Sequence, residues 1–181
     1  ASSGYFESLN VDMIFDFPSQ TEAVLRSDLE RIASCGCQQT TFSPLYQSNA
    51  TMRKMAATLG PLRYDRERCF YEIVDETLAG GDAPGFKRRT LWTFNRLDGE
   101  SRSREHLEVD EYAVAYEECV GIGSGSITHL GGDLYVNSFG LNEYRAAVEA
   151  GRLPLLGKTA LSRHDLMRYR FLLQLYALRF D

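Results

Sequence analysis

The spacing of apolar residues predicts a strand, a helix and a second strand within the first 46 positions. Apolar and polar residues alternate between residues 10 and 17, as in a strand with one buried face. Apolar residues then recur at helical spacing from about residue 22 to Gly36, a residue type that commonly ends helices. A second strand is expected over residues 38–46. This order is typical of a βαβ unit, in which the two strands run parallel.

Four further helices are expected along the chain. They cover about residues 49–59, 65–79, 140–150 and 163–180. The start of the first helix has two interpretations, because Ser19 and Glu22 have the spacing of a capping box and Thr21 is the alternative N-cap. The last helix follows a cap predicted from Ser162 to Asp165.

The remaining tracts predict strands and one exposed loop. Residues 88–96 alternate as in a strand, and residues 126–139 predict a hairpin that turns at Gly131 and Gly132. Residues 97–111 are highly charged and are expected to form an exposed loop. The fold class is therefore α/β. Two parallel strands are too few for a complete barrel or a doubly wound sheet, so we expect the chain to be part of a larger protein.

Composition narrows the classes of protein that remain. The chain has a net charge of −5, a pI near 5.3 and a mean hydropathy of −0.30. This balance argues against a nucleic-acid surface, which usually needs a basic stripe. We interpret the basic tracts 87–89 and 163–170 as solvated faces. No apolar run of about 18 residues is present, so no membrane segment is expected. The four cysteines are few for a disulfide scaffold, which favours the cytoplasm.

The cysteines and histidines do not predict a metal centre. Cys35 and Cys37 flank Gly36, but the glycine is explained by the end of the helix, and no second Cys or His pair has ligand spacing. The three histidines are scattered, and none of them pairs with another at helical spacing. We also find no Ser-His-Asp or Cys-His arrangement in a recognisable context, although such triads need not be close in sequence.

Two carboxylates lie on one face of the first apolar strand, and an unpaired buried charge is costly. Asp12 has two interpretations. It either bonds to neighbouring backbone N–H groups or accepts hydrogen bonds from the hydroxyl pair of a ligand, as acidic residues do for ribose. Asp16 is closer to the turn, so we expect it to be a solvated or capping residue.

A glycine-rich run lies at residues 121–125, where Gly121, Gly123 and Gly125 alternate with other residues. It either allows close packing of a strand or lets a ligand approach the main chain. It is not a P-loop, because no Gly-Lys-Ser/Thr follows, and Ser126 takes the place of the third glycine of a dinucleotide fingerprint.

Five segments carry a resemblance to a known family. They are "VDMIFDFPSQT", "TTFSPLY", "VDEYAVAYEECVGIGSGSIT", "LYVNSFGLNEYRAAVEAGRLP" and "LSRHDLMRYRFLLQLYALRFD", in this order. Together they resemble the C-terminal half of oxygen-independent coproporphyrinogen III oxidase and its radical S-adenosylmethionine (SAM) relatives. The resemblance covers nearly the whole chain and is weakest over residues 80–108.

The resemblance implies a partial (β/α) barrel with a C-terminal domain of its own. Residues 1–60 would be the C-terminal part of the barrel, and residues 61–181 a family-specific domain on the substrate side. In the family, a [4Fe–4S] cluster on C-x-x-x-C-x-x-C cleaves SAM to a 5′-deoxyadenosyl radical. That radical abstracts hydrogen from propionate side chains of coproporphyrinogen III, and oxidative decarboxylation gives protoporphyrinogen IX in haem biosynthesis. The protein holds and orients the cofactor.

The resemblance also implies cofactor contacts. Asp12 matches the aspartate of the family's D-L-I-Y-G-L-P strand, which contacts SAM. Tyr46 matches a position that contacts a second SAM, and Ile127 matches another position that contacts the cofactor. At both positions the main chain, more than the side chain, is expected to make the contact. Gly123 and Gly125 are expected to border the cofactor beside Ile127.

The chain departs from the family pattern at three places. The cysteine motif is absent, so the cluster ligands are not in this chain, and the chain alone is expected to be inactive. Asp16 replaces the family's usual glycine, and the tract 87–96 differs from the better-known members.

These departures leave the substrate open. The alternatives to the oxidase are a haem-binding or haem-delivery relative and a radical SAM methyltransferase acting on haem. In each case the ligand is a porphyrinogen or a haem-like small molecule. We expect no nucleic-acid or membrane partner. The apolar strand at residues 10–17 would otherwise form an exposed edge, so the isolated chain is expected either to self-associate or to shield this strand with another element.

Overall fold

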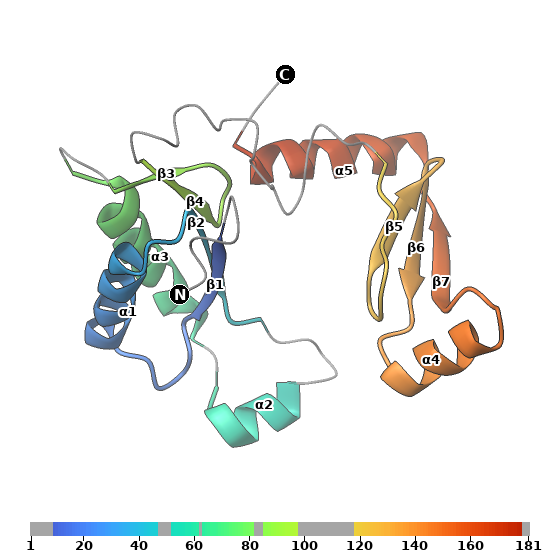
Figure 1. Ribbon diagram of the computed structural model, residues 1–181, viewed down its shortest axis with the longest axis horizontal. Helices are drawn as coiled ribbons and strands as arrows, with labels where there is room; N and C mark the ends of the chain where they lie inside the picture. Colours follow the sequence, from blue (N-terminus) through green and yellow to red (C-terminus); the bar gives the residue numbers. More distant parts are fainter. Residues whose placement is uncertain (1–8, 47–51, 62, 82–84, 98–117, 179–181) are drawn as a thin grey trace. The chain divides into compact units, whose positions relative to one another are not determined.

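The computed structural model describes residues 9–46, 52–61, 63–81, 85–97 and 118–178. The chain divides into two compact units, Ala1–Asp110 and Glu111–Asp181 (Figure 1). This division does not coincide with the expected boundary at residue 60. The assignment of residues 1–60 to a barrel and of residues 61–181 to a substrate-side domain stays a prediction.

The first unit is built on a four-stranded sheet in the order β1-β2-β4-β3. The strands β1 (Asn10–Phe15) and β2 (Gln39–Pro44) run parallel, and the helix α1 (Glu22–Ser34) connects them. The predicted βαβ unit is therefore confirmed. The strands β3 (Phe86–Arg88) and β4 (Thr93–Arg96) pair antiparallel with each other, and β4 also pairs antiparallel with β2. Two more helices belong to this unit, α2 (Met52–Leu59) and α3 (Tyr64–Ala79).

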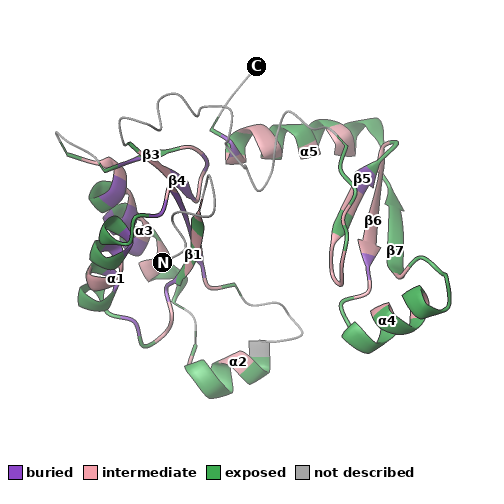
Figure 2. Ribbon diagram, viewed as in Figure 1, coloured by how far each residue is buried: buried purple, intermediate pink, exposed green. Residues whose placement is uncertain are grey.

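One face of this sheet is apolar and packs against α1 and α3 (Figures 1 and 2). Each of the four strands contributes one buried phenylalanine to this face: Phe15, Phe42, Phe86 and Phe94. The helices supply the other side of the core: Leu25, Leu29, Ile32, Phe70, Ile73, Val74 and Leu78. Burying a large apolar side chain contributes roughly 1.5–3 kcal/mol, so this cluster is the main source of stability in the first unit.

Local signals set the ends of α1. Thr21 is the N-cap, since its hydroxyl accepts a hydrogen bond from the Val24 N–H at 3.3 Å. The alternative capping box from Ser19 is therefore not formed. Gly36 has φ +76° directly after the C-cap residue Cys35, as expected for a glycine that ends a helix.

The prediction of one strand over residues 88–96 is wrong, because the tract turns in its middle. The Thr90 hydroxyl accepts hydrogen bonds from the N–H groups of Trp92 and Thr93, which closes a tight turn between β3 and β4. A threonine that bonds its own backbone two or three residues on favours a turn over a continued strand. The expected charged loop at 97–111 lies outside the described residues apart from its first position.

The second unit contains the three-stranded antiparallel sheet β5-β6-β7. The strands β5 (Ile127–Leu130) and β6 (Asp133–Asn137) form the predicted hairpin, which turns at Gly131 and Gly132 with φ of +62° and +81°. The helix α4 (Leu141–Glu149) joins β6 to β7 (Leu155–Ala160), and α5 (Arg163–Tyr176) follows β7. The sequence pattern does not indicate β7, because its sequence "LLGKTA" has no strand alternation and contains a glycine.

The two units differ in how much they bury. Within β5–β7, α4 and α5, only His129 and Asn137 are buried, and both are polar (Figure 2). The helix α5 begins with a capping box between Ser162 and Asp165, as expected. These described elements of the second unit therefore depend more on backbone hydrogen bonds and caps than on an apolar core.

Candidate functional site

The side chain of Asp12 lies on the face of β1 opposite to the apolar core and is exposed. Its Oδ1 accepts a hydrogen bond from the Asn10 Nδ2 at 2.7 Å. The same Asn10 nitrogen lies 3.5 Å from the Thr41 hydroxyl, and Thr41 is the register partner of Asp12 on β2. Asp12 is therefore a solvated carboxylate, and the cost of an unpaired buried charge does not arise here.

Polar side chains continue from Asp12 across the sheet. In register, Asp12 pairs with Thr41 and Thr41 with Thr93, so these three side chains lie in one row on one face. A second row holds Gln39 and Asn95, whose side chains are joined by a hydrogen bond of 2.9 Å. The sheet thus has an apolar face toward α1 and α3 and a polar face on its other side. The sequence pattern does not indicate the four other residues of these rows, Thr41, Thr93, Gln39 and Asn95, because their alternation becomes meaningful only when the strand register is known.

Tyr46 follows β2 and is 66% exposed. The strands β1 and β2 are still paired at this point, since the Leu45 N–H donates to the Phe15 carbonyl at 2.9 Å. Because β1 and β2 are parallel, Tyr46 lies at the edge of the sheet where both strands end, which is where α/β folds commonly bind ligands. The expected contact from Asp12 and Tyr46 to a cofactor stays a prediction.

The expectation that Asp16 is solvated or caps a helix is wrong. Its carboxylate Oδ1 lies 2.8 Å from both Nε and an Nη of Arg66, and the residue is 3% exposed. The backbone turns sharply here: Asp16 has φ +65°, and its N–H donates to the Gln20 Oε1 at 2.7 Å. This turn directs the carboxylate toward α3 instead of toward solvent. A left-handed φ favours glycine, which agrees with the glycine that the family resemblance implies at this position.

Arg66 on α3 bonds three residues of the loop that follows β1. Besides the Asp16 carboxylate, its guanidinium donates to the carbonyls of Phe17 at 2.6 Å and Gln20 at 2.8 Å. These carbonyls belong to the loop after β1, so Arg66 ties α3 to that loop. This contact fixes the loop at the end of the strand that carries Asp12.

Two residues of the glycine run have a structural explanation in the second unit. A Cβ on Gly121 would clash with the Ile127 carbonyl oxygen, and one on Gly125 would lie 2.8 Å from the Phe139 ring. Gly125 also has φ +73°. Close packing therefore accounts for both glycines. Gly123 has φ +109° and open space beside it, so only its backbone conformation requires glycine.

Ile127 is the first residue of β5, and its side chain is exposed. Its main chain packs against Gly121 on one side. The backbone of this segment is further fixed by Asn137, whose Nδ2 donates to the Gly123 carbonyl at 3.0 Å and to the Ser126 hydroxyl at 2.9 Å. Asp12 and Tyr46 belong to the first unit, whereas Gly123, Gly125 and Ile127 belong to the second. The cofactor contacts of these three residues also stay predictions.

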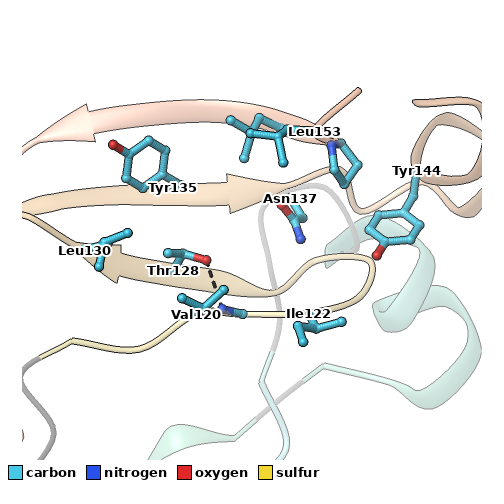
Figure 3. Close-up of a pocket in the computed structure, with 11 residues that line it drawn as sticks. Val120, Ile122, Thr128, Leu130, Tyr135, Asn137, Tyr144 and Leu153 are labelled. Carbon is cyan, nitrogen blue, oxygen red and sulfur yellow. Dashed lines mark hydrogen bonds between the residues drawn. The ribbon is translucent and has the colours of Figure 1, made fainter. Parts of the chain in front are cut away.

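The second unit contains a groove of about 540 Å³ (Figure 3). The sequence did not indicate this groove, although one residue of its lining, Gly121, belongs to the glycine run described above. Its lining is mostly apolar: Val120, Gly121, Ile122, Thr128, Leu130, Tyr135, Asn137, Tyr144, Leu153, Pro154 and Leu155. Within this lining, the Thr128 hydroxyl accepts a hydrogen bond from the Gly121 N–H at 2.9 Å. The volume is that of a site for a small organic molecule.

The groove and α5 lie on opposite faces of the sheet. Thr128 and Tyr135 are register partners and line the groove, whereas His129 points to the other face. There its ring centre lies 5.0 Å from that of Tyr169 on α5, with the two ring planes tilted. Beside Tyr135, the Lys158 ammonium lies 2.5 Å from an Asp133 carboxylate oxygen, and this contact lowers the pKa of Asp133. One edge of the apolar groove is thus bordered by a paired charge.

Among the described residues, no group of three or more His, Cys, Asp or Glu side chains could hold a metal ion. In the same part of the chain, no helix is both long and apolar enough to cross a membrane.

The fold of the chain is similar to part of a larger solved structure. It superposes on coproporphyrinogen III oxidase (HemN) from Escherichia coli, a radical SAM enzyme, with a TM-score of 0.67 and 21% identity. The superposition covers 97% of this chain and 42% of that protein. The mixed α/β class is therefore confirmed, and this comparison shows the fold alone.

The sequence comparison leads to the same group of proteins. The chain is 26% identical, over an alignment of 184 residues, to the oxygen-independent coproporphyrinogen III oxidases of two Helicobacter pylori strains, 26695 and J99. The alignment covers 93% of this chain and 38% of each relative. No family model matches the chain. The expected resemblance is confirmed, and the chain spans less than half the length of the curated relatives it matches.

Proposed function

We propose that this chain is part of a radical SAM enzyme that resembles oxygen-independent coproporphyrinogen III oxidase and acts on a porphyrinogen. The reaction of the whole protein would be the oxidative decarboxylation of coproporphyrinogen III to protoporphyrinogen IX. The observation that supports this most is the extent of the two comparisons, which cover 93% and 97% of the chain and concern proteins of the same name. A match this extensive includes both units.

In this proposal the two units have different tasks. The parallel strands β1 and β2, with α1 outside them, would be late strands of a partial barrel, and the polar face with Asp12 would be its inner face. The second unit would be the domain on the substrate side. Its groove has the size and apolar lining that suit a tetrapyrrole edge.

The residues of the polar face fit SAM. An exposed carboxylate has several acceptor positions, and Asp12 uses one of them for Asn10. The amine and hydroxyl groups of SAM are donors that this carboxylate would accept. When bound with its cluster, the cofactor would supply the radical chemistry. This chain's own contribution would be to bind and orient it through Asp12, held in place by Asn10, and through the main chain at Tyr46.

The residues present do not fit the [4Fe–4S] cluster. Such a cluster is held by several cysteine thiolates. Cys35 and Cys37 share one turn, whereas Cys69 is on α3 and Cys119 is in the other unit. The cluster ligands of the proposed enzyme are therefore not among these four residues, and we expect this chain alone to be inactive.

The first test is binding of SAM to the full-length protein by calorimetry. Asp12→Asn removes the charge and keeps the shape, and loss of a charge-assisted hydrogen bond costs about 1.5–3 kcal/mol. We therefore expect affinity to fall roughly 10- to 100-fold. Asp28→Asn is the matched control, because Asp28 lies on α1, on the opposite side of the sheet. Equal affinities of the two variants would remove Asp12 from the cofactor site.

A second assay concerns the substrate. The full-length protein, incubated anaerobically with SAM, a reductant and coproporphyrinogen III, should release carbon dioxide and form protoporphyrinogen IX. SAM cleavage without decarboxylation would instead support the alternative of a radical SAM methyltransferase acting on haem. Haem binding without SAM cleavage would support a delivery protein.

A further inference from the structure

Two cysteines meet in the turn that ends α1. Cys35 is exposed, whereas Cys37, on the other side of Gly36, is fully buried. The Cys35 sulfur lies 3.3 Å from the Ile32 carbonyl oxygen, and the Cys37 sulfur lies 3.9 Å from the same atom. Both thiols therefore point to one acceptor and lie beside each other.

The backbone around this pair is fixed from another strand. Arg96 on β4 donates from Nε to the Cys37 carbonyl at 2.7 Å, and from an Nη to the Ala33 carbonyl at 3.0 Å. Gly36 provides the turn with φ +76°, and nothing lies within 4 Å of the place where its Cβ would be. Arg96 and the turn at Gly36 thus fix the backbone that carries both thiols.

We propose that Cys35 and Cys37 are a redox pair that forms a reversible intrachain disulfide with small disulfides such as oxidised glutathione. Cys35 is the thiol that solvent-borne disulfides reach, and Cys37 is the resolving thiol, because burial shields it from them. The residues of this redox pair are not among the proposed SAM and porphyrinogen contacts. The redox pair and the proposed enzymatic function are therefore tested independently.

The exchange has two balanced steps. The Cys35 thiolate attacks one sulfur of oxidised glutathione, so that a mixed disulfide forms and one glutathione leaves as its thiolate. The Cys37 thiolate then attacks the Cys35 sulfur, and the second glutathione leaves. The protein loses two electrons and two protons in total, and these reduce one glutathione disulfide to two glutathione thiols.

The surroundings explain why Cys37 attacks second. Burial, followed by the hydrogen bond and charge of Cys35, raises the pKa of Cys37 to about 11, whereas Arg96 acts in the opposite direction. In the mixed disulfide Cys35 carries neither a thiol proton nor a charge. The contribution of Cys35 to the raised pKa of Cys37 is then gone, whereas burial, which is the largest cause, and the opposing effect of Arg96 both remain.

The test is oxidation of the 181-residue chain with glutathione disulfide, followed by acid quenching, trypsin and mass spectrometry. The tryptic peptide 32–53 contains Cys35 and Cys37 and no other cysteine. We expect its mass to fall by two hydrogen atoms. Cys69, an exposed cysteine in the peptide 69–87, is the internal control and should retain a glutathione adduct.

Variants separate the roles of the two thiols. Thiols tethered this closely have an effective concentration of roughly millimolar or more, so Cys37→Ser should retain about tenfold more adduct on Cys35 than wild type. Cys35→Ser should leave Cys37 unmodified under conditions that modify Cys69. Cys37→Ala, checked for folding by circular dichroism, must give the same result as Cys37→Ser. A lasting adduct on Cys35 in wild type, or no modification of Cys35 at all, would overturn the proposal.

Discussion

Replacing Arg66 by methionine should destabilise the first unit more than replacing its buried partner Asp16 by glycine. Arg66→Met keeps the aliphatic stem over Phe70, where the guanidinium now lies 4.5 Å from the ring centre, but leaves the Asp16 carboxylate buried without its counter-ion. Asp16→Gly removes the carboxylate and leaves Arg66 its two carbonyl acceptors.

The structure gives an approximate size for each effect. Removing one partner of a buried ion pair costs about 3–5 kcal/mol. The Arg66 side chain is 19% exposed and that of Asp16 is 5% exposed, which places Arg66→Met near the lower limit, about 3 kcal/mol. Asp16→Gly loses a charged hydrogen bond, about 1.5–3 kcal/mol, but relieves the left-handed backbone at φ +65° by about 1 kcal/mol. We expect a net loss of about 1 kcal/mol.

Urea unfolding followed by tryptophan fluorescence measures the first unit alone. The chain has one tryptophan, and Trp92 packs against Tyr71 and Phe15 in the first unit, with ring centres 5.2 and 6.3 Å apart. The matched control is Arg68→Met on the same helix. Arg68 pairs with Glu72 in full solvent, and such pairs contribute less than about 1 kcal/mol.

The double variant Asp16→Gly/Arg66→Met completes a thermodynamic cycle. Because neither charge is then left without its partner, its cost should be about 2 kcal/mol less than the sum of the two single costs. Equal losses for Arg66→Met and Arg68→Met, or simple additivity in the double variant, would refute the assignment of Asp16 and Arg66 as a coupled buried pair.

Two further predictions concern the second unit. Gly125→Ala should lower the stability of this unit by about 1–2 kcal/mol, because residue 125 has a left-handed φ and its Cβ would touch Phe139. An unchanged melting temperature would contradict this backbone conformation. The SAM affinity of the full-length variant tests the predicted cofactor contact separately. The hydrogen bond from Ser162 lowers the pKa of Asp165 in the folded chain. The stabilisation from this cap should therefore be present above the pKa of Asp165 in the unfolded chain and be lost as pH falls through its pKa in the folded chain. Helicity measured by circular dichroism should decline with acid in wild type, and a Ser162→Ala chain with the same acid profile would contradict the contribution of the cap.

Local sequence signals predicted most of the fold. Thr21 and Gly36 could be recognised as ends of α1 because a cap acts within three or four residues. The hairpin at Gly131 and Gly132 was equally local, since its turn requires positive φ at both positions. The strand β7 lacked such a signal, because its partner β6 and not its own sequence makes it a strand.

The candidate site was less accessible from the sequence, because its contacts are distant along the chain. Arg66 lies 50 residues from Asp16, and no pattern near Asp16 indicates a guanidinium above it. The row of Asp12, Thr41 and Thr93 depends on the register of three strands. Asp12 could be selected as a candidate from its place on an apolar strand, and the family resemblance implies its cofactor contact, whereas its neighbours needed the structure.

The uneven burial of the two units has a calorimetric consequence. The heat capacity change of unfolding and the sensitivity to denaturant both grow with the apolar surface that unfolding exposes. The phenylalanine-rich core of the first unit contributes such surface, whereas β5–β7, α4 and α5 bury only the polar His129 and Asn137. We therefore expect a calorimetric scan to record mainly the first unit, with a smaller and broader heat signal from the described elements of the second unit.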